Sequence, residues 1–168
     1  MIATVTPATS TSRDISNAWK EMQTGKLCFP FSDDGRTDPE TKIGEIKDQV
    51  RPAGWPVEVL SAGEGRCLAQ LVVAEEHQNT FGTLHGGFTA TVVDEVSTLA
   101  LMTTGSGHPG VSVDLNVSYL KAANLGDKIL IDAKTLKAGK RLAFLEVEIK
   151  KESGELIAKG SHTKFVSS

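Results

Sequence analysis

The residues best suited to chemistry in this chain lie in one stretch, from Asn79 to Met102. A loop that begins at Asn79 leads into His85-Gly86-Gly87, and a mostly apolar segment that contains Asp94 follows. Glycines at the entry of a helix let a ligand come close to the backbone, because no Cβ is in the way. The first amides of a helix have no partner within it and carry partial positive charge. The stretch therefore combines free backbone donors with a carboxylate, and it is the candidate active site.

Free donors and a carboxylate suit a reaction in which water attacks a carbonyl carbon. Backbone donors aimed at the developing oxyanion contribute on the order of 10²–10³ in rate per donor, and a carboxylate can act as the base that activates water. Each group also has a structural explanation that stays open. Asp94 could be a helix acid paired with a Lys or Arg, Gly86-Gly87 could form a tight helix entry, and Asn79 could be a turn or cap residue.

The spacing between Gly86 and Asp94 predicts how many chains such a site needs. The two residues are eight positions apart, and at ~1.5 Å per residue they lie roughly 12 Å apart along one helix. One reacting carbonyl cannot contact both, so if both act in one site, one of them belongs to another copy of the chain. Two such helices packed antiparallel about a two-fold axis would provide the pairing twice. We therefore predict a homodimer with two shared sites.

Strands on both sides of this stretch are predicted from apolar periodicity and turn residues. The candidates before it are 57–62 and 66–73, and those after it are 112–119, 128–136, 142–150 and 156–165. Residues 112–119 alternate strictly between polar and apolar, which is typical of a half-buried strand. Short turns with Gly between the later strands indicate antiparallel hairpins.

The predicted central helix is apolar around most of its circumference, so it should be covered on several sides. One long helix against one antiparallel sheet places the fold in the α+β class. The 168 residues divide into three parts by composition. Residues 1–13 are predicted to be a flexible tail, residues 14–56 an amphipathic helix with a Pro-rich irregular connector, and residues 57–168 the domain itself.

Composition and charge exclude several classes of protein. A net charge of -3 argues against binding nucleic acid by bulk attraction. No apolar run approaches the roughly 20 residues of a membrane-spanning helix, and the N-terminus lacks the pattern of a secretory signal. We therefore expect a cytoplasmic protein, with the mitochondrial matrix as the alternative because residues 1–13 faintly resemble a presequence. The two cysteines and four histidines show no ligand spacing, so no metal site is predicted.

Three segments carry a resemblance to a known family. They are 82–94 with His85-Gly86-Gly87 and Asp94, 109–114 with Gly-Val-Ser-Val-Asp, and 157–164 with Lys-Gly-Ser-His-Thr-Lys. Through them the chain from about 57 to 166 resembles the hotdog-fold acyl-CoA thioesterases. It looks most similar to the group of thioesterase superfamily member 2 and the phenylacetate-degradation thioesterases. The resemblance implies a hotdog thioesterase domain over 57–168, in which an antiparallel sheet is wrapped around one long central helix.

The resemblance also implies an activity and a set of catalytic residues. Enzymes of this family hydrolyse an acyl-CoA to a free acid and CoA, and they need no cofactor because CoA is part of the substrate. The role of water activator or nucleophile falls on Asp94, and the amide that polarises the thioester carbonyl is that of Gly86. Asn79 would hold the water or the carbonyl, Ser112 would position the water, and His85 would orient the loop. The family further implies a dimer of dimers.

The three phosphates of CoA require local positive charge in a chain that is acidic overall. A turn with three cations and an exposed backbone is the best candidate for this role. The predicted CoA-binding residues are those of the turn, Lys137, Gly139, Lys140 and Arg141, with Tyr119, Lys121 and Lys164 in addition. A solvated hairpin tip without a ligand is the alternative explanation for the same turn.

Two other functions stay open from the sequence, and a third is excluded. An α/β-hydrolase is excluded because the chain has no Gly-x-Ser-x-Gly motif. A hotdog hydratase or dehydratase would need a His paired with an acid, and His85 is the only obvious partner of Asp94. A non-catalytic acyl-CoA sensor would keep the pocket and the basic turn, but it would not need Asp94 and Asn79 together.

Overall fold

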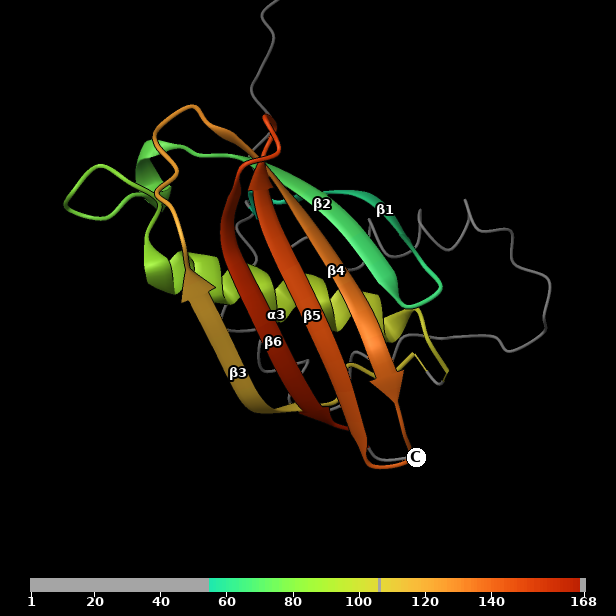
Figure 1. The fold of residues 1–168 in the computed structure, drawn as a ribbon. Coiled ribbons are helices and arrows are strands. Elements are labelled where there is room, and N and C mark those ends of the chain that lie inside the picture. Colours follow the sequence, from blue (N-terminus) through green and yellow to red (C-terminus); the bar gives the residue numbers. More distant parts are fainter. Residues whose placement is uncertain (1–54, 106, 167–168) are drawn as a thin grey trace, which may run out of the picture.

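The computed structural model describes residues 55–105 and 107–166 of the chain. These residues form one six-stranded sheet with a long helix across one of its faces (Figure 1). In chain order the elements are β1 (Glu58–Gly63), β2 (Arg66–Val72), the short 3-10 helix η1 (Glu75–His77), α3 (Gly86–Met102), β3 (Val111–Tyr119), β4 (Lys128–Ala138), β5 (Leu142–Lys151) and β6 (Leu156–Phe165). The predicted tail over 1–13, and nearly all of the helix and connector predicted over 14–56, lie outside the described residues.

The sheet has the strand order β1-β2-β4-β5-β6-β3, and all neighbouring strands are antiparallel. This arrangement confirms the predicted α+β class. The register places Tyr119 beside Ala158 and Val111 beside Phe165. Leu142, just after the β4–β5 turn, also pairs with Phe165. The β4–β5 turn and the start of β3 therefore share one end of the sheet, and the end of β3 lies at the other.

The core lies between α3 and the sheet, and it is built from alternating strand residues. Along β5, buried residues alternate with more exposed ones, as expected for a strand with one covered face. The matching buried side of α3 consists of Thr89, Val92, Val93, Val96, Ser97, Leu99, Ala100, Leu101 and Met102. Gly87 and Thr91 are exposed. The four consecutive residues Leu99–Met102 are all buried, so the C-terminal turn of α3 is covered on several sides, as predicted, whereas the N-terminal half of the helix keeps an exposed face.

One glycine sets how closely the helix approaches the sheet. Gly160, in the middle of β6, faces α3, and a Cβ at this position would lie 2.5 Å from Val93 Cγ1. Ordinary contacts of a Cβ begin at 3.4 Å, so no side chain fits at this position unless the helix moves. The glycine therefore brings the segment of α3 around Asp94 close to β6.

The edge strand β3 differs from the half-buried strand that its alternation predicts. Its first six residues are exposed, and the exposed fractions of Val111 and Val113 are 68% and 61%. Of the residues of β3, Val117 is the one that packs against the core. The prediction is wrong for a single chain because β3 lies at the edge of the sheet, whereas α3 packs mainly over β2 and β4. An edge strand also presents a row of unpaired N–H and C=O groups.

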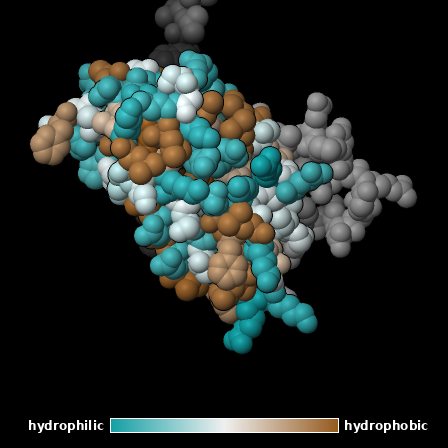
Figure 2. All heavy atoms as spheres, in the orientation of Figure 1, coloured by the Kyte–Doolittle hydropathy of each residue, from teal (hydrophilic) through white to brown (hydrophobic). Residues whose placement is uncertain are grey.

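The outer face of the sheet, which points away from α3, also carries apolar side chains. Phe144 and Phe165 follow buried neighbours on their strands and are 42% and 40% exposed. In the orientation of Figure 1 the strands lie in front of α3, so this outer face is turned to the viewer. Figure 2 shows that apolar groups gather there in patches between hydrophilic ones.

Candidate active site

The loop that leads into α3 is held by backbone hydrogen bonds on two sides. Leu84 N–H donates to Ala123 O at 2.8 Å, and His85 N–H donates to His77 O at 2.8 Å. His77 also stacks on Phe88 in the first turn of α3, with the ring centroids 4.7 Å apart. The helix entry is therefore fixed in place although it is rich in glycine.

His85 caps the N-terminus of α3 and leaves one backbone donor free. Its Nδ1 accepts the N–H of Gly87 at 2.9 Å, so the proton of the neutral ring lies on Nε2. No hydrogen bond among the described residues uses the N–H of Gly86, the first residue of the helix. The helix dipole adds partial positive charge at this point. The Gly86 amide is thus a free donor that suits a developing oxyanion.

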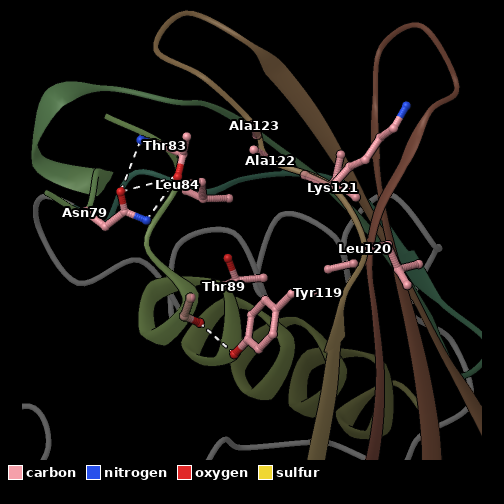
Figure 3. A pocket seen from close by; sticks show the side chains of 12 residues that line it. Asn79, Thr83, Leu84, Thr89, Tyr119, Leu120, Lys121, Ala122 and Ala123 are labelled. Atoms are coloured by element: carbon pink, nitrogen blue, oxygen red, sulfur yellow. Dashed lines mark hydrogen bonds between the residues drawn. The ribbon is translucent and has the colours of Figure 1, made fainter. Parts of the chain in front are cut away.

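A cavity of about 400 Å³ lies beside Gly86 (Figure 3). Tyr119 forms one wall, because its hydroxyl donates to Gly86 O at 2.9 Å and its ring lies 3.4 Å from the position of a Cβ on Gly86. Thr89 and Lys121 contribute polar groups, and Leu84 contributes an apolar one. Cavities of this size hold small ligands, so a carbonyl group with part of its attached chain would fit.

Asn79 lines the same cavity, but its side chain forms hydrogen bonds within its own loop. Its Oδ1 accepts the N–H of Phe81 at 2.9 Å and that of Thr83 at 3.2 Å, and its Nδ2 donates to Thr83 Oγ1 at 3.0 Å (Figure 3). This geometry is that of a turn residue, the structural alternative for this position. The predicted contact of Asn79 with a water or a carbonyl stays a prediction.

Four side chains converge on one oxygen of Asp94, in the middle of α3. Oδ1 lies 3.4 Å from Thr98 Oγ1, 3.5 Å from Ser112 Oγ, 3.6 Å from His162 Nε2 and 3.7 Å from Lys164 Nζ. No hydrogen bond or ion pair among the described residues involves Oδ2, and the side chain is 37% exposed. One carboxylate oxygen is therefore held by the protein, while the other is free to accept a proton from water.

His162 supports this arrangement from β6, where its side chain is fully buried. Nδ1 lies 2.8 Å from Ser97 Oγ, and Nε2 lies 2.9 Å from Ser112 Oγ. Burial lowers the pKa of His162 and the Lys164 ammonium lowers it further, so the ring is neutral at pH 7. Because the Ser112 hydroxyl lies 2.9 Å from this ring and 3.5 Å from Asp94 Oδ1, His162 fixes a hydroxyl that is close to the carboxylate.

The sequence assigned no role to His162, one of these four side chains, or to Glu95, which follows Asp94 on the helix. One signal was available for His162, because Gly160, His162 and Lys164 alternate on β6 and share the face toward α3. Burial raises the pKa of Glu95 and the charge of Asp94 adds to the effect, whereas Lys164 opposes it. A second acid therefore lies near Asp94 without being one of the contacts of its Oδ1.

Lys164 lies in a different place from the one that its predicted role in CoA binding requires. Its side chain is 5% exposed, and its Nζ donates to Thr98 Oγ1 at 2.6 Å beside Asp94. Burial lowers the pKa of Lys164, and the negative charge of Asp94 partly opposes this effect. A phosphate does not reach a buried ammonium, so Lys164 does not belong with the other predicted CoA-binding residues.

Those other residues fall into two groups at opposite ends of the sheet (Figure 1). Tyr119 and Lys121 line the cavity, where Lys121 is paired with Glu155. The basic turn, with Lys137, Gly139, Lys140 and Arg141, is exposed at the end where β3 begins. The eight steps of ~3.3 Å along β3 separate these two ends by roughly 26 Å. One chain does not bring the two groups together.

Gly86 and Asp94 are also too far apart within one chain to act together. α3 runs without interruption over Gly86–Met102, so eight residues at ~1.5 Å each place the two roughly 12 Å apart. The free donor and the carboxylate of one chain therefore cannot act on the same carbonyl.

In residues 55–105 and 107–166, no group of three or more His, Cys, Asp or Glu side chains could hold a metal ion. No helix in this part of the chain has the length and apolar character needed to cross a membrane. The cytoplasmic or mitochondrial location stays a prediction.

Comparison with known proteins identifies the family of this chain. The model of the thioesterase superfamily matches residues 81–158, which include Gly86, Asp94 and Ser112. Acyl-coenzyme A thioesterase 13 of Homo sapiens is 50% identical over 111 residues, which are 66% of this chain and 79% of that relative. The chain belongs to the thioesterase superfamily.

Solved structures of thioesterases agree with this family. The crystal structure of zebra fish thioesterase superfamily member 2 matches with a TM-score of 0.71 and 43% identity, over 79% of this chain and 100% of that one. A hypothetical thioesterase protein from Streptococcus pneumoniae, solved with coenzyme A, matches with a TM-score of 0.64 and 27% identity, over 67% and 86% of the two chains. The predicted hotdog fold and the resemblance to the group of thioesterase superfamily member 2 are thereby confirmed.

Proposed function

We propose that this thioesterase hydrolyses the thioester bond of an acyl-CoA and releases a free acid and CoA. The observation that carries the proposal is the presence of two reactive parts on one helix. A free backbone donor lies at Gly86, and a carboxylate with one unengaged oxygen lies at Asp94. The human relative named as an acyl-CoA thioesterase and the streptococcal thioesterase solved with coenzyme A support an acyl-CoA as the substrate.

In the proposed reaction Asp94 acts as a general base. Its Oδ2 takes a proton from a water molecule that Ser112 helps to position, and the water oxygen forms a bond with the carbonyl carbon. The carbonyl oxygen becomes an oxyanion and accepts the N–H of Gly86. The C–S bond then breaks, and the CoA sulfur leaves with the electron pair and receives the proton that Asp94 holds. Direct attack of Asp94 on the carbonyl is the alternative route to the same products.

Both parts come together when two chains share each site. β3 has an exposed edge that carries Val111 and Val113, and pairing with β3 of a second copy would continue the sheet. Antiparallel pairing about a two-fold axis places the Val111 end of one β3 against the Tyr119 end of the other. Asp94 of one chain then approaches the Gly86 amide and the cavity of its partner, which supports the predicted homodimer.

The same pairing gives the basic turn its predicted role in CoA binding. Lys140 and Arg141 are exposed and lie beside the start of β3, which the two-fold axis carries to the partner's cavity. Cations at this place would bind the phosphates of CoA while the thioester reaches the Gly86 amide. The outer face, with Phe144 and Phe165 partly exposed, offers a second apolar surface for the dimer of dimers.

The two rival functions make different demands on the site. A hydratase needs a histidine that reaches the substrate, but both ring nitrogens of His162 are engaged and its side chain is fully buried. His85 uses its Nδ1 to cap the helix at Gly87. A sensor would bind acyl-CoA without breaking the thioester, so only an activity measurement separates it from the proposed enzyme.

Release of CoA from a series of acyl-CoA substrates of different chain length tests the proposal. Asp94→Asn keeps the shape of the side chain but removes the base, so kcat should fall by about 10²–10⁴-fold while acyl-CoA still binds. Glu64→Gln makes the same carboxylate-to-amide change at an exposed acid between β1 and β2, at the far edge of the sheet from β3, so it is the matched control and should keep its activity. If folded wild-type protein released no CoA from any of the substrates, the proposal would be wrong and the sensor would remain.

A further inference from the structure

Lys164 is a lysine whose charged end is buried instead of exposed to water. Its side chain is 5% exposed, and its Nζ lies 3.7 Å from Asp94 Oδ1. A buried ammonium is costly unless it has a counter-charge and hydrogen bonds. Asp94 supplies the counter-charge, and Thr98 supplies a hydrogen bond at 2.6 Å. The ammonium is therefore part of the surroundings of the carboxylate.

The hydrogen bonds of Thr98 fix the position of this ammonium. The Thr98 hydroxyl has one hydrogen and donates it to Asp94 O at 2.7 Å, so its oxygen accepts from Lys164 Nζ. The distance of 3.7 Å between Nζ and Asp94 Oδ1 is longer than a hydrogen bond. Lys164 thus acts on the carboxylate by its charge and leaves the carboxylate lone pairs available.

The other charged groups around Asp94 do not replace this cation. Glu95 follows on the same helix, and Asp114 acts on His162 from β3, so both acids disfavour further negative charge here. On β6 the remaining neighbours are His162 and Lys164. Burial lowers the pKa of His162, which leaves that ring uncharged at pH 7. Among the described residues, Lys164 is the cation that lies beside the Asp94 carboxylate.

We propose that Lys164 is a positioning residue. Its buried ammonium, which lies beside Oδ1 and is held by Thr98, keeps the Asp94 carboxylate in place so that Oδ2 can accept the proton of water. This inference rests on the proposed role of Asp94 in thioester hydrolysis. It replaces the predicted contact between Lys164 and the phosphates of CoA, so it predicts an effect on kcat and none on KM.

Steady-state kinetics of Lys164→Met test the proposal. Without the ammonium beside Oδ1 the carboxylate is no longer held, so kcat should fall by about 10- to 10²-fold while KM stays unchanged. Lys164→Arg keeps the cation and should restore most of the wild-type kcat. Lys159→Met, at an exposed lysine of the same strand, is the matched control and should leave kcat unchanged.

A second measurement does not depend on activity. The 13Cε signal of Lys164 reports its titration, and Asp94→Asn should lower the pKa of Lys164 further, because the carboxylate stabilises the ammonium. Circular dichroism establishes that each variant is folded, and if Lys164→Met is not, this titration decides alone. An unchanged kcat in folded Lys164→Met, or an equal pKa of Lys164 in wild type and Asp94→Asn, would overturn the proposal.

The two proposals fail in different ways. If the wild-type protein released no CoA, the proposed function would be wrong, and no values of kcat could be compared. The titration of Lys164 would still show whether its charge is paired with that of Asp94.

Discussion

Gly160→Ala is the substitution whose effect follows most directly from the structure. A Cβ at this position would lie 2.5 Å from Val93 Cγ1, whereas ordinary contacts begin at 3.4 Å. The difference means that the buried Val93 side chain, with the part of α3 that carries it, must shift by about 1 Å, and overpacking of this kind destabilises a protein by about 1–3 kcal/mol. Asp94 follows Val93 on the helix, so the same movement displaces the carboxylate from Ser112. A misplacement of about 1 Å can lower the rate by about 10²-fold.

Urea unfolding and CoA release measure the two consequences of Gly160→Ala separately. Val93→Ala removes the methyl groups that clash, so the double variant should be more stable than the two single changes predict, by about 1 kcal/mol or more. Gly63→Ala is the matched control, because no heavy atom lies within 4 Å of a Cβ there. If Gly160→Ala were as stable and as active as Gly63→Ala, the explanation of how β6 positions Asp94 would be refuted.

Two further predictions concern the substrate. Replacement of both Lys140 and Arg141 by Ala should raise KM for acyl-CoA with little change in kcat, because the phosphates bind far from the thioester. Steady-state kinetics check this, and an unchanged KM would remove the basic turn from the CoA site. Tyr119→Phe removes the hydrogen bond to Gly86 O, so kcat/KM should fall by about 2- to 10-fold. Full activity in this variant would show that the hydroxyl does not help to hold the helix entry.

Most strands were predictable because alternation and turn glycines depend on local sequence. β2, β5 and β6 begin at the predicted residues, Arg66, Leu142 and Leu156. β3 is the exception, since its alternation predicts a buried face that one chain does not provide. Apolar periodicity reflects burial in the assembled protein, so a predicted but uncovered face can indicate an interface. This explanation agrees with the shared site that the spacing of the central helix predicts.

The candidate site was predictable where its residues lie on one element, and not where the fold brings elements together. Gly86 and Asp94 stand in one motif at the start of α3. His162 and Lys164 reach Asp94 only because β6 passes under the helix at Gly160. The sequence around these residues does not predict this packing of a strand against a distant helix. Lysine side chains are usually exposed at the surface, but Lys164 is buried because it lies on the face of β6 that packs against α3.

The central claim is that each site combines Gly86 of one chain with Asp94 of another, and mixed dimers test it most directly. Gly86→Pro removes the N–H at the first helical position, where proline fits and the preceding His85 is already extended. Gly86→Ala keeps the N–H and is its control. Gly86→Pro and Asp94→Asn should each be inactive as homodimers.

After subunit exchange between Gly86→Pro and Asp94→Asn, half of the dimers should be hybrids, and each hybrid should hold one intact site out of two. The mixture should therefore regain about a quarter of the wild-type rate of CoA release. Native mass spectrometry of differently tagged chains confirms that the hybrids have formed. No regain of activity in a mixture that contains hybrid dimers would contradict the shared site.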